Sequence, residues 1–382
     1  QRVGCVYVHY EVLELEGGLM TWQLVSGANT YDVVDVKVSK QVKSLNVATI
    51  KTVGNVAVDT VVVLTKDGST AFKGIVKKRT SDDQIIYQYE IVELATELAD
   101  YVLSEGIKVY DTLNQTTHDI VGDILNFTPS DGVPWTVGMC DEDVQTTPGS
   151  QYLIVGDYAG WNRNENLMSG GYKFSINDQV MFTGTLPSNL ATDTVYYVVY
   201  ESTQYIKVSE TEGGTAITIA DAAEFKIHKL VRYMSVYWGK RINALMKVVN
   251  DLSGYCLWFN SFTKTVNYGY QRAYGGDITT LVYQTKPQEE TYKKNYDRVV
   301  VLGKTDTIKG EAGTGNKVIV YRYEDATTTE EATDLAKTIL KDVGQSSLRM
   351  TLTLPTTSNI NEADIVKVSG VYYFVFDVTE TY

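Results

Sequence analysis

The amino-acid sequence predicts a mainly β protein with an α+β middle region: two similar small antiparallel β-barrels, an α/β connecting domain and an inserted small β domain. The 28 tyrosines, together with abundant valine and threonine, favour half-buried strands over helices. Alternating apolar and polar residues beside glycine turns occur near both ends of the chain. Helical spacing of apolar residues is limited to a few short segments.

With 382 residues, the chain is long enough for two to four domains. We expect the first barrel over residues 1–105 and the second barrel over residues 291–382. The middle domain is expected over 106–160 and 229–290, and the inserted β module over 161–228 separates its two parts.

The first barrel is expected to begin with strands over 5–15 and 20–25 and one long bent strand from Tyr31 to Val53. Further strands are expected over 59–65, 70–79 and 84–92. Lys66-Asp67-Gly68 marks a tight turn, because glycine tolerates positive φ. Successive antiparallel strands with short loops are typical of a small barrel or sandwich.

Apolar residues at helical spacing predict helices over 91–103, 116–127, 239–254 and 328–343. Thr328 and Glu331 fit a capping box at the start of the last helix. Gly254 provides a stop for the helix before it. Strands are expected around the last helix at Arg298–Gly303, Lys317–Tyr323 and Arg349–Leu354.

The hairpin of the first barrel has a counterpart at the end of the chain, with a shorter turn. Asp59, Val61, Val63, Gly68, Phe72 and Val76 correspond in pattern to Asp364, Val366, Val368, Gly370, Phe374 and Val378. One interpretation is that any two β-hairpins are alike. The other is that one chain contains two equivalent barrels, so that three chains approximate a sixfold ring.

The inserted module is rich in strands over residues 171–228, and its aromatic residues have two interpretations. In a domain of about sixty residues, alternating aromatics are needed to bury enough apolar area, so most are expected in the core. Exposed tyrosines would instead stack against sugars. Tyr196, Tyr197 and Tyr200 are the hypothetical glycan contacts.

Lys77-Lys78-Arg79 is the sharpest basic run and lies at the end of the repeated hairpin. Its ordinary interpretation is a solvated strand end that protects a sheet edge. The alternative hypothesis is contact with an acidic neighbouring subunit. The net charge of −13 argues against a nucleic-acid-binding surface, but like charge would let DNA slide past without binding.

Catalytic and metal-binding patterns are weak in this sequence. A nucleophilic enzyme needs a base beside its nucleophile, and His118-Asp119 is more simply a favourable charge at a helix start. The loop Gly310–Val318 lacks the contiguous Gly-Lys-Ser/Thr of a phosphate-binding loop. The acidic run Cys140–Asp143 lacks calcium-loop spacing, and the three cysteines have no CxxC spacing. We therefore expect no catalytic residue, cofactor or metal.

The run STAFKGIVKKRTSDDQIIYQYEIVELATELADYVL resembles the first barrel of the hub proteins of tailed-phage baseplates and tail tips. Gly68, Phe72, Gly74 and Val76 match a GxxxFxGxV hairpin of that family. THDIVGDILN looks like the helix that leads into the family's middle domain, and KRINALMKVVNDLSGYCLWFNSFTKTVNYG is similar to its later helix and strand pair. YDRVVVLGKT looks like the start of the second barrel, and only residues 161–228 fall outside the resemblance.

The resemblance implies a homotrimer in the virion tail, whose six barrels join a sixfold tail tube or distal tail ring to a threefold tip, spike or fibre protein. DNA would pass through its lumen without specific binding, and the protein would have no enzymatic activity. Two other hypotheses remain: an adhesin that binds host surface glycan through the 171–228 module, and a cell-wall-degrading enzyme, for which the sequence offers no credible set of residues.

Overall fold

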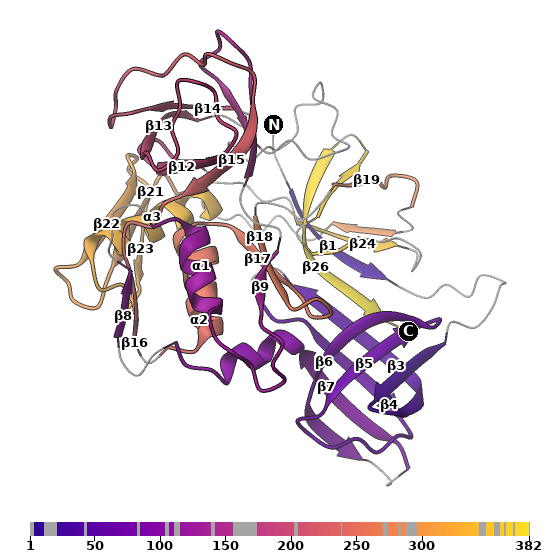
Figure 1. Ribbon diagram of the computed structural model, residues 1–382. Helices are drawn as coiled ribbons and strands as arrows, with labels where there is room; N and C mark the ends of the chain where they lie inside the picture. The colour runs from indigo at the N-terminus through magenta and orange to yellow at the C-terminus, as the bar shows by residue number, and fades with distance from the viewer. Residues whose placement is uncertain are drawn as a thin grey trace.

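The computed structural model describes residues 4–10, 21–41, 44–81, 85–103, 107–110, 115–138, 142–155, 174–201, 205–237, 239–269, 274–281, 284–287, 296–343, 349–354, 360–362, 364–369 and 371–381. Figure 1 shows two barrels and a group of terminal strands arranged around a helix-bearing middle region. The mainly β fold class predicted from the sequence is confirmed, with two closed six-stranded antiparallel barrels.

The first closed barrel contains the strands β2 (Trp22–Ser26), β3 (Asn29–Gln41), β4 (Val47–Thr52), β5 (Val61–Lys66), β6 (Ser69–Ser81) and β7 (Tyr87–Glu93). They pair in the order β2-β5-β6-β7-β4-β3, and a further β2–β3 pairing closes the ring. Leu24, Ile50, Leu64, Tyr89 and Ile91 are buried inside it. The ring closes through residues 29–32 of β3, so residues 37–41 of the same strand are left to pair outside the barrel.

One prediction within this barrel is wrong: residues 31–53 form two antiparallel strands, β3 and β4, and not one long bent strand. β3 and β4 run antiparallel, and Ser39 pairs with Val47. The side-chain oxygen of Asn46 accepts a hydrogen bond from the backbone N–H of Gln41 at 3.1 Å, which ties the two ends of the reversal together. Alternation of apolar residues continues through both strands, so the pattern alone did not mark the turn.

The second closed barrel is the inserted module, and it starts earlier than residue 161. Its strands are β10 (Glu142–Thr146), β11 (Leu153–Val155), β12 (Gln179–Gly184), β13 (Tyr196–Glu201), β14 (Tyr205–Ser209) and β15 (Glu224–Lys229). β10 and β11 lie between β15 and β14, so the ring cannot close without them. Phe174, Phe182, Tyr196 and Ile227 are among the buried residues of its core.

The C-terminal strands form a six-stranded unit that includes the N-terminus. β1 (Gly4–Tyr10), β19 (Tyr274–Asp277), β20 (Gln284–Pro287), β24 (Arg349–Leu354), β25 (Ile365–Val368) and β26 (Val371–Thr381) pair in the order β19-β25-β26-β1-β24-β20. β1 is parallel to both of its neighbours, whereas every pairing in the first barrel is antiparallel. Within the residues that the structure describes, β19 and β20 do not pair with each other.

β3 and β26 join the first barrel to the C-terminal unit. Residues 37–41 pair with residues 377–381, so both units belong to one 12-stranded sheet. Across this seam, Lys40 forms a 2.9 Å ion pair with Glu380. The yellow β26 therefore runs directly onto the indigo barrel in Figure 1.

The middle region includes α1 (Thr117–Leu125), α2 (Arg241–Met246) and the short strands β8 (Ile107–Tyr110), β9 (Thr136–Val137), β16 (Met234–Tyr237), β17 (Cys256–Asn260) and β18 (Thr265–Gly269). It also holds β21 (Arg298–Leu302), β22 (Lys309–Gly313), β23 (Val318–Arg322) and α3 (Thr329–Val343). Val299, Val301 and Leu335 share one buried core with residues of α1 and α2. Residues 298–343, expected in the second barrel, therefore pack with the middle region, because α3 buries its apolar face there.

The predicted helices differ in how they form. The 116–127 helix is α1, with a capping box between Thr116 and Asp119. The 328–343 helix is α3. The 239–254 segment divides into α2 and a π-helical turn over Lys247–Leu252, before Gly254 at φ +72°. The 91–103 segment is the end of β7 followed by a 3₁₀-helix over Leu94–Ala99.

Among the described residues, none of the helices combines the length and the apolar composition needed to cross a membrane.

Candidate functional site

The hairpin β5–β6 carries the predicted family motif on the wall of the first barrel. Gly68 lies in the turn at φ +77°, a conformation that glycine adopts without strain. Phe72 and Val76 are buried in the barrel core. A Cβ atom on Gly74 would overlap the carbonyl oxygen of Val92 and the side chain of Ile91 on the neighbouring strand. Gly74 is thus required by close packing, and the four motif residues have structural roles.

The two repeated hairpins share one turn geometry. Asp67 at φ +50° precedes Gly68, and Ser369 at φ +50° takes the same place in β25–β26. Both turns contain two residues, because Lys66 pairs with Ser69 and Val368 pairs with Val371. The sequence comparison predicted a shorter second turn. This prediction is wrong, because the two turns have the same length.

Counting back from these turns changes which residues of the two hairpins correspond. Leu64 now matches Val366, and both are buried. Val62 likewise matches Asp364, which is also buried. Val61, which the sequence comparison matched to Val366, is on the outer face and 46% exposed. Phe374 is paired with Ile365, but its side chain lies outside the described part of the chain.

The basic run lies on the return strand β6 and is partly engaged within the first barrel. Lys77 is 3.4 Å from the carboxylate of Asp59. Arg79 donates to the side chain of Asn55 at 2.6 Å and lies over the ring of Tyr87. Lys77 and Arg79 thus connect the segment before β5 to β6, which is a structural role. Lys78 is exposed to solvent.

The hypothetical glycan contacts Tyr196, Tyr197 and Tyr200 do not form one surface. Tyr196 is buried in the core of the inserted barrel, and its hydroxyl accepts a hydrogen bond from the backbone N–H of Ala191 at 2.9 Å. Tyr197 lies on the opposite face of β13 and contacts Gln179 at 3.3 Å. Tyr200 is 42% exposed and lies after a bulge in the β13–β14 pairing. Strand alternation therefore separates these side chains.

Tyr200 instead belongs to an exposed aromatic cluster with Tyr152 and Tyr205. The ring of Tyr152 is 5.8 Å from the ring of Tyr200 and 5.5 Å from the ring of Tyr205. The ammonium group of Lys207 lies 4.4 Å from the centre of the Tyr152 ring and 5.4 Å from that of Tyr200. Tyr152 precedes residue 161, where the sequence placed the module boundary, so sequence reasoning missed it.

His118 and His228, the two histidines whose side chains the structure describes, pack against each other, while the aspartate that follows His118 is used in the helix cap. Asp119 is used in the capping box, where its carboxylate accepts a hydrogen bond from the backbone N–H of Thr116 at 3.0 Å. The ring of His118 packs 5.9 Å from the ring of His228. His228 also lies within 2.5 Å of the hydroxyl of Thr183. The side chain of His9 lies outside the described residues.

The segment Gly310–Val318, expected as a loop, includes the end of β22 and the first residue of β23. Only residues 314–317 connect these two strands, which lie on opposite sides of β21. A strand follows residues 314–317, whereas a phosphate-binding loop needs a helix whose N-terminal N–H groups face the phosphate. A Cβ atom on Gly315 would overlap the side chain of Asp297, so this glycine permits close packing. Cys140 and Asp141 of the acidic run lie outside the described residues.

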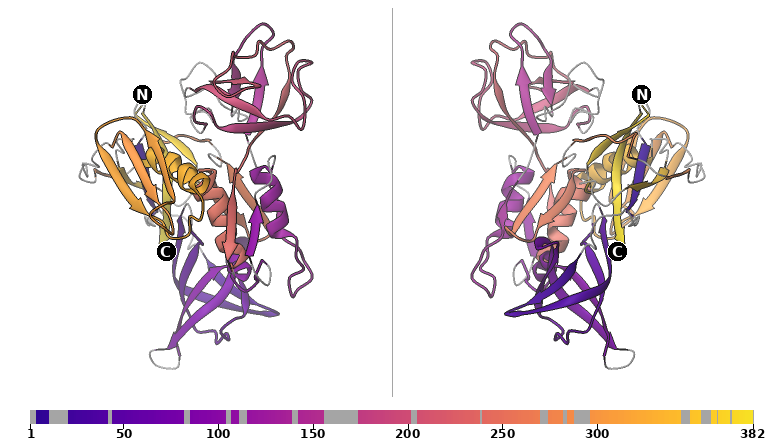
Figure 2. Two further views of the ribbon diagram at one scale, coloured as in Figure 1. Left: turned by 90° about the vertical axis from the view of Figure 1, so that its left-hand side faces the viewer. Right: turned by 90° about the vertical axis from the view of Figure 1, so that its right-hand side faces the viewer.

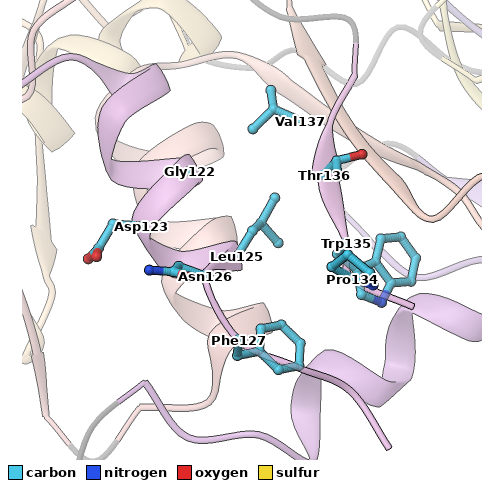
Figure 3. Close-up of a pocket in the computed structure, with 9 residues that line it drawn as sticks. All are labelled: Gly122, Asp123, Leu125, Asn126, Phe127, Pro134, Trp135, Thr136 and Val137. Atoms are coloured by element: carbon cyan, nitrogen blue, oxygen red, sulfur yellow. The ribbon is translucent and has the colours of Figure 1, made fainter. Parts of the chain in front are cut away.

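An open cavity of about 490 Å³ lies between α1 and β9 (Figure 3). Leu125, Phe127 and Val137 face its interior. Asp123 points away, and its carboxylate accepts a hydrogen bond from the hydroxyl of Tyr110 at 2.7 Å. Burial, followed by this bond to Asp123, raises the pKa of Tyr110. Its lining is mainly apolar, with Asn126 and Thr136 among the polar residues.

A second cavity of about 290 Å³ lies where the first barrel, the β17–β18 hairpin and the C-terminal unit meet. Glu93, at the end of β7, accepts hydrogen bonds from the backbone N–H of Asn46 and from the hydroxyl of Ser261, both at 3.3 Å. These bonds fasten the barrel to the middle region. The polar lining is thus engaged in holding domains together.

Comparison with known proteins finds the same fold in tail proteins. Neither a protein-family model nor a curated protein sequence matches this chain. The 43 kDa tail protein of prophage MuSo2 from Shewanella oneidensis matches 94% of this chain and 93% of its own, with 10% identity and a TM-score of 0.51. The tail protein from Neisseria meningitidis MC58 matches 94% of this chain and 90% of its own, with 10% identity and a TM-score of 0.50. The likeness extends over nearly the whole chain and concerns the fold.

Proposed function

We propose that this protein is a structural component of a phage tail, a trimeric hub at the distal end of the tail tube that adapts a sixfold tube to a threefold tip. The observation that carries the proposal is the fold shared with two tail proteins along 94% of the chain.

The arrangement of β-units supports the hub. The chain presents a closed barrel and a second six-stranded unit, joined edge to edge through β3 and β26. Three copies would contribute six such units, which is the number that a sixfold tube presents. β19 and β20 each pair with one neighbour within the described residues, so their free edges can pair with adjacent subunits.

The edge strand β23 is a candidate contact between copies. Within the described chain it pairs only with β21. Val320 is 58% exposed on this strand, and Val318 and Tyr321 are exposed beside it. An apolar strand with one unpaired edge is a template for another chain, and we expect it to be covered in the assembled ring.

The charge balance fits a passage for DNA. Each chain has a net charge of −13, so a trimer would be strongly acidic. Acidic walls would repel phosphate and keep DNA mobile during ejection. An assembled ring whose lumen is lined by lysine and arginine would contradict this part of the proposal. The proposed partners are the distal ring of the tail tube and a tip, spike or fibre protein.

Solution mass tests the hub directly. Light scattering after size exclusion should give three times the chain mass of 42.6 kDa. A monomer at the highest soluble concentration would refute the trimer. Val320→Glu should lower the mass, because it places a charge on the β23 edge. Ile176→Glu, at a similarly exposed position of the inserted barrel, is the matched control and should leave the mass unchanged. An unchanged trimer in Val320→Glu would remove β23 from the interface and leave the hub.

A further inference from the structure

We infer that the outer wall of the inserted barrel carries a carbohydrate-binding site, formed by Tyr152, Tyr200 and Tyr205 around Lys207. The occupant is a sugar residue of a bacterial surface polysaccharide. This inference stands independently of the trimeric hub, because it depends only on the geometry of one barrel.

Strand alternation places the cluster outside the barrel. Leu153, Ile206 and Val208 are buried in the core, so the adjacent Tyr152, Tyr205 and Lys207 project outward. The exposed fractions of Tyr152, Tyr200 and Tyr205 are 40, 42 and 37%. Three large rings thus remain in contact with water although the barrel is complete without them, unlike Tyr196 in its core.

Lys207 organises the cluster. It pairs with Tyr200 across β14 and β13, and its ammonium group lies near the rings of both Tyr200 and Tyr152. Its nitrogen also donates to the side-chain oxygen of Gln151 at 3.3 Å. These contacts hold the lysine and the rings in one arrangement before any ligand arrives, which reduces the entropy lost on binding.

The chemistry of the cluster fits a sugar. A pyranose has apolar C–H faces and polar hydroxyl edges, which complement a tyrosine ring and its polar tip. An ammonium group has three donors, and Gln151 takes one from Lys207. Within the described part of the chain, no hydrogen bond joins the hydroxyl group of Tyr152 or Tyr200 to another residue. Apolar faces, a cation and hydroxyl groups therefore converge on one exposed surface.

The test uses the full chain on an array of bacterial capsular, O-antigen and cell-wall polysaccharides, with saturation-transfer NMR against a mixture of common monosaccharides. The wild-type chain should bind at least one polysaccharide. Tyr200→Ala and Lys207→Ala should each weaken that binding by about tenfold or more. Tyr197→Ala is the matched control, since Tyr197 lies on the same strand outside the cluster, and it should bind as the wild type does.

Three outcomes would overturn the inference. The first is that no polysaccharide binds and no monosaccharide receives saturation. The second is that the Tyr200→Ala and Lys207→Ala variants, with unchanged circular dichroism spectra, bind as the wild type does. The third is that these variants lower the oligomeric mass and leave sugar binding intact, which would make the cluster a contact between subunits.

Discussion

Glycine illustrates how single residues decide this fold. Gly68 provides the positive φ of a hairpin turn, whereas Gly74 makes room for the neighbouring strand. Gly122 lies within α1 and has open space where its Cβ atom would lie. Glycine is therefore needed for its backbone conformation at position 68 and for close packing at position 74. At position 122 neither reason applies.

Substitution by alanine should separate these cases. Gly74→Ala should reduce the free energy of unfolding by about 2 kcal/mol, because overpacking forces two paired strands apart. Gly122→Ala is the control, and it should increase that free energy by about 0.5 kcal/mol, since alanine favours a helix and meets no obstacle. Urea unfolding followed by circular dichroism measures both. A Gly74→Ala variant as stable as the wild type would contradict the close packing.

Two tyrosines should make the protein sensitive to alkali. Burial raises the pKa of Tyr110 and of Tyr323, and the hydrogen bonds that they donate to Asp123 and Asp251 raise it further. An unfolded tyrosine ionises near pH 10, whereas these two remain protonated in the folded chain. The unfolded state therefore binds fewer protons above pH 10, and stability falls as the pH rises, by about 1.4 kcal/mol per pH unit for each group.

Thermal unfolding between pH 9 and pH 11 measures this dependence. The double variant Tyr110→Phe and Tyr323→Phe should lose less stability than the wild type over this range, because phenylalanine cannot ionise. An equal loss in both proteins would show that other groups control alkaline unfolding.

At the scale of elements, buried carboxylates connect α3 to its surroundings. Glu331 is fully buried, pairs with Lys247 at 2.9 Å and accepts a hydrogen bond from the backbone N–H of Ser235 at 3.0 Å. Its backbone N–H is 3.2 Å from the hydroxyl of Thr328, the capping contact that the sequence predicted. One side chain of the first helical turn thus joins α3 to β16 and to the turn after α2.

Asp178 joins α3 to the inserted barrel. Its carboxylate forms ion pairs with Lys229 and with Lys337, both at 2.9 Å, and is almost completely buried. Asp178→Ala would leave two partly buried lysines without their anion, and should destabilise the chain by about 3 kcal/mol. Glu212→Ala, an exposed substitution in the same barrel, should change stability by less than about 0.5 kcal/mol. Urea titration of both variants checks this, and equal midpoints would contradict it.

At the scale of the whole molecule, each closed barrel has its own hydrophobic core, and the middle region has one core that several elements share. The two closed barrels each have a hydrophobic cluster of their own. The middle region collects residues from α1, α2, α3 and β21 into a single cluster. In Figure 2 the inserted barrel stands at one end and the first barrel at the other, with this shared core between them.

Fragments should reveal this organisation. Residues 21–93 should fold alone with a cooperative thermal transition, because their barrel is closed and its core is complete. Residues 296–343 should remain unfolded, because Val299, Val301 and Leu335 lose the partners of their core. Circular dichroism of both fragments is the measurement. A disordered 21–93 fragment or an ordered 296–343 fragment would contradict the division.

Local signals carried most of what could be predicted. Asp67-Gly68 marked a turn, Thr328 and Glu331 marked a helix start, and alternation marked the strands on either side of Gly68. Each of these signals acts between residues that are close in the chain, so the sequence displays it directly. The motif residues Gly68, Phe72, Gly74 and Val76 were identified differently, by their match to the hairpin of a family that the sequence resembles.

By itself, the amino-acid sequence determined most of the strands, turns and helices, although not the turn between β3 and β4. Only the tertiary structure decided which distant segments pair: β1 with β24 and β26, β3 with β26, and β10 with β15. It also brought Tyr152 to Tyr200 and separated Tyr200 from Tyr196. The physical reason is that strand edges offer the same backbone donors and acceptors everywhere, so partners are selected by the packing of the whole chain and not by residues that can be recognised one segment at a time.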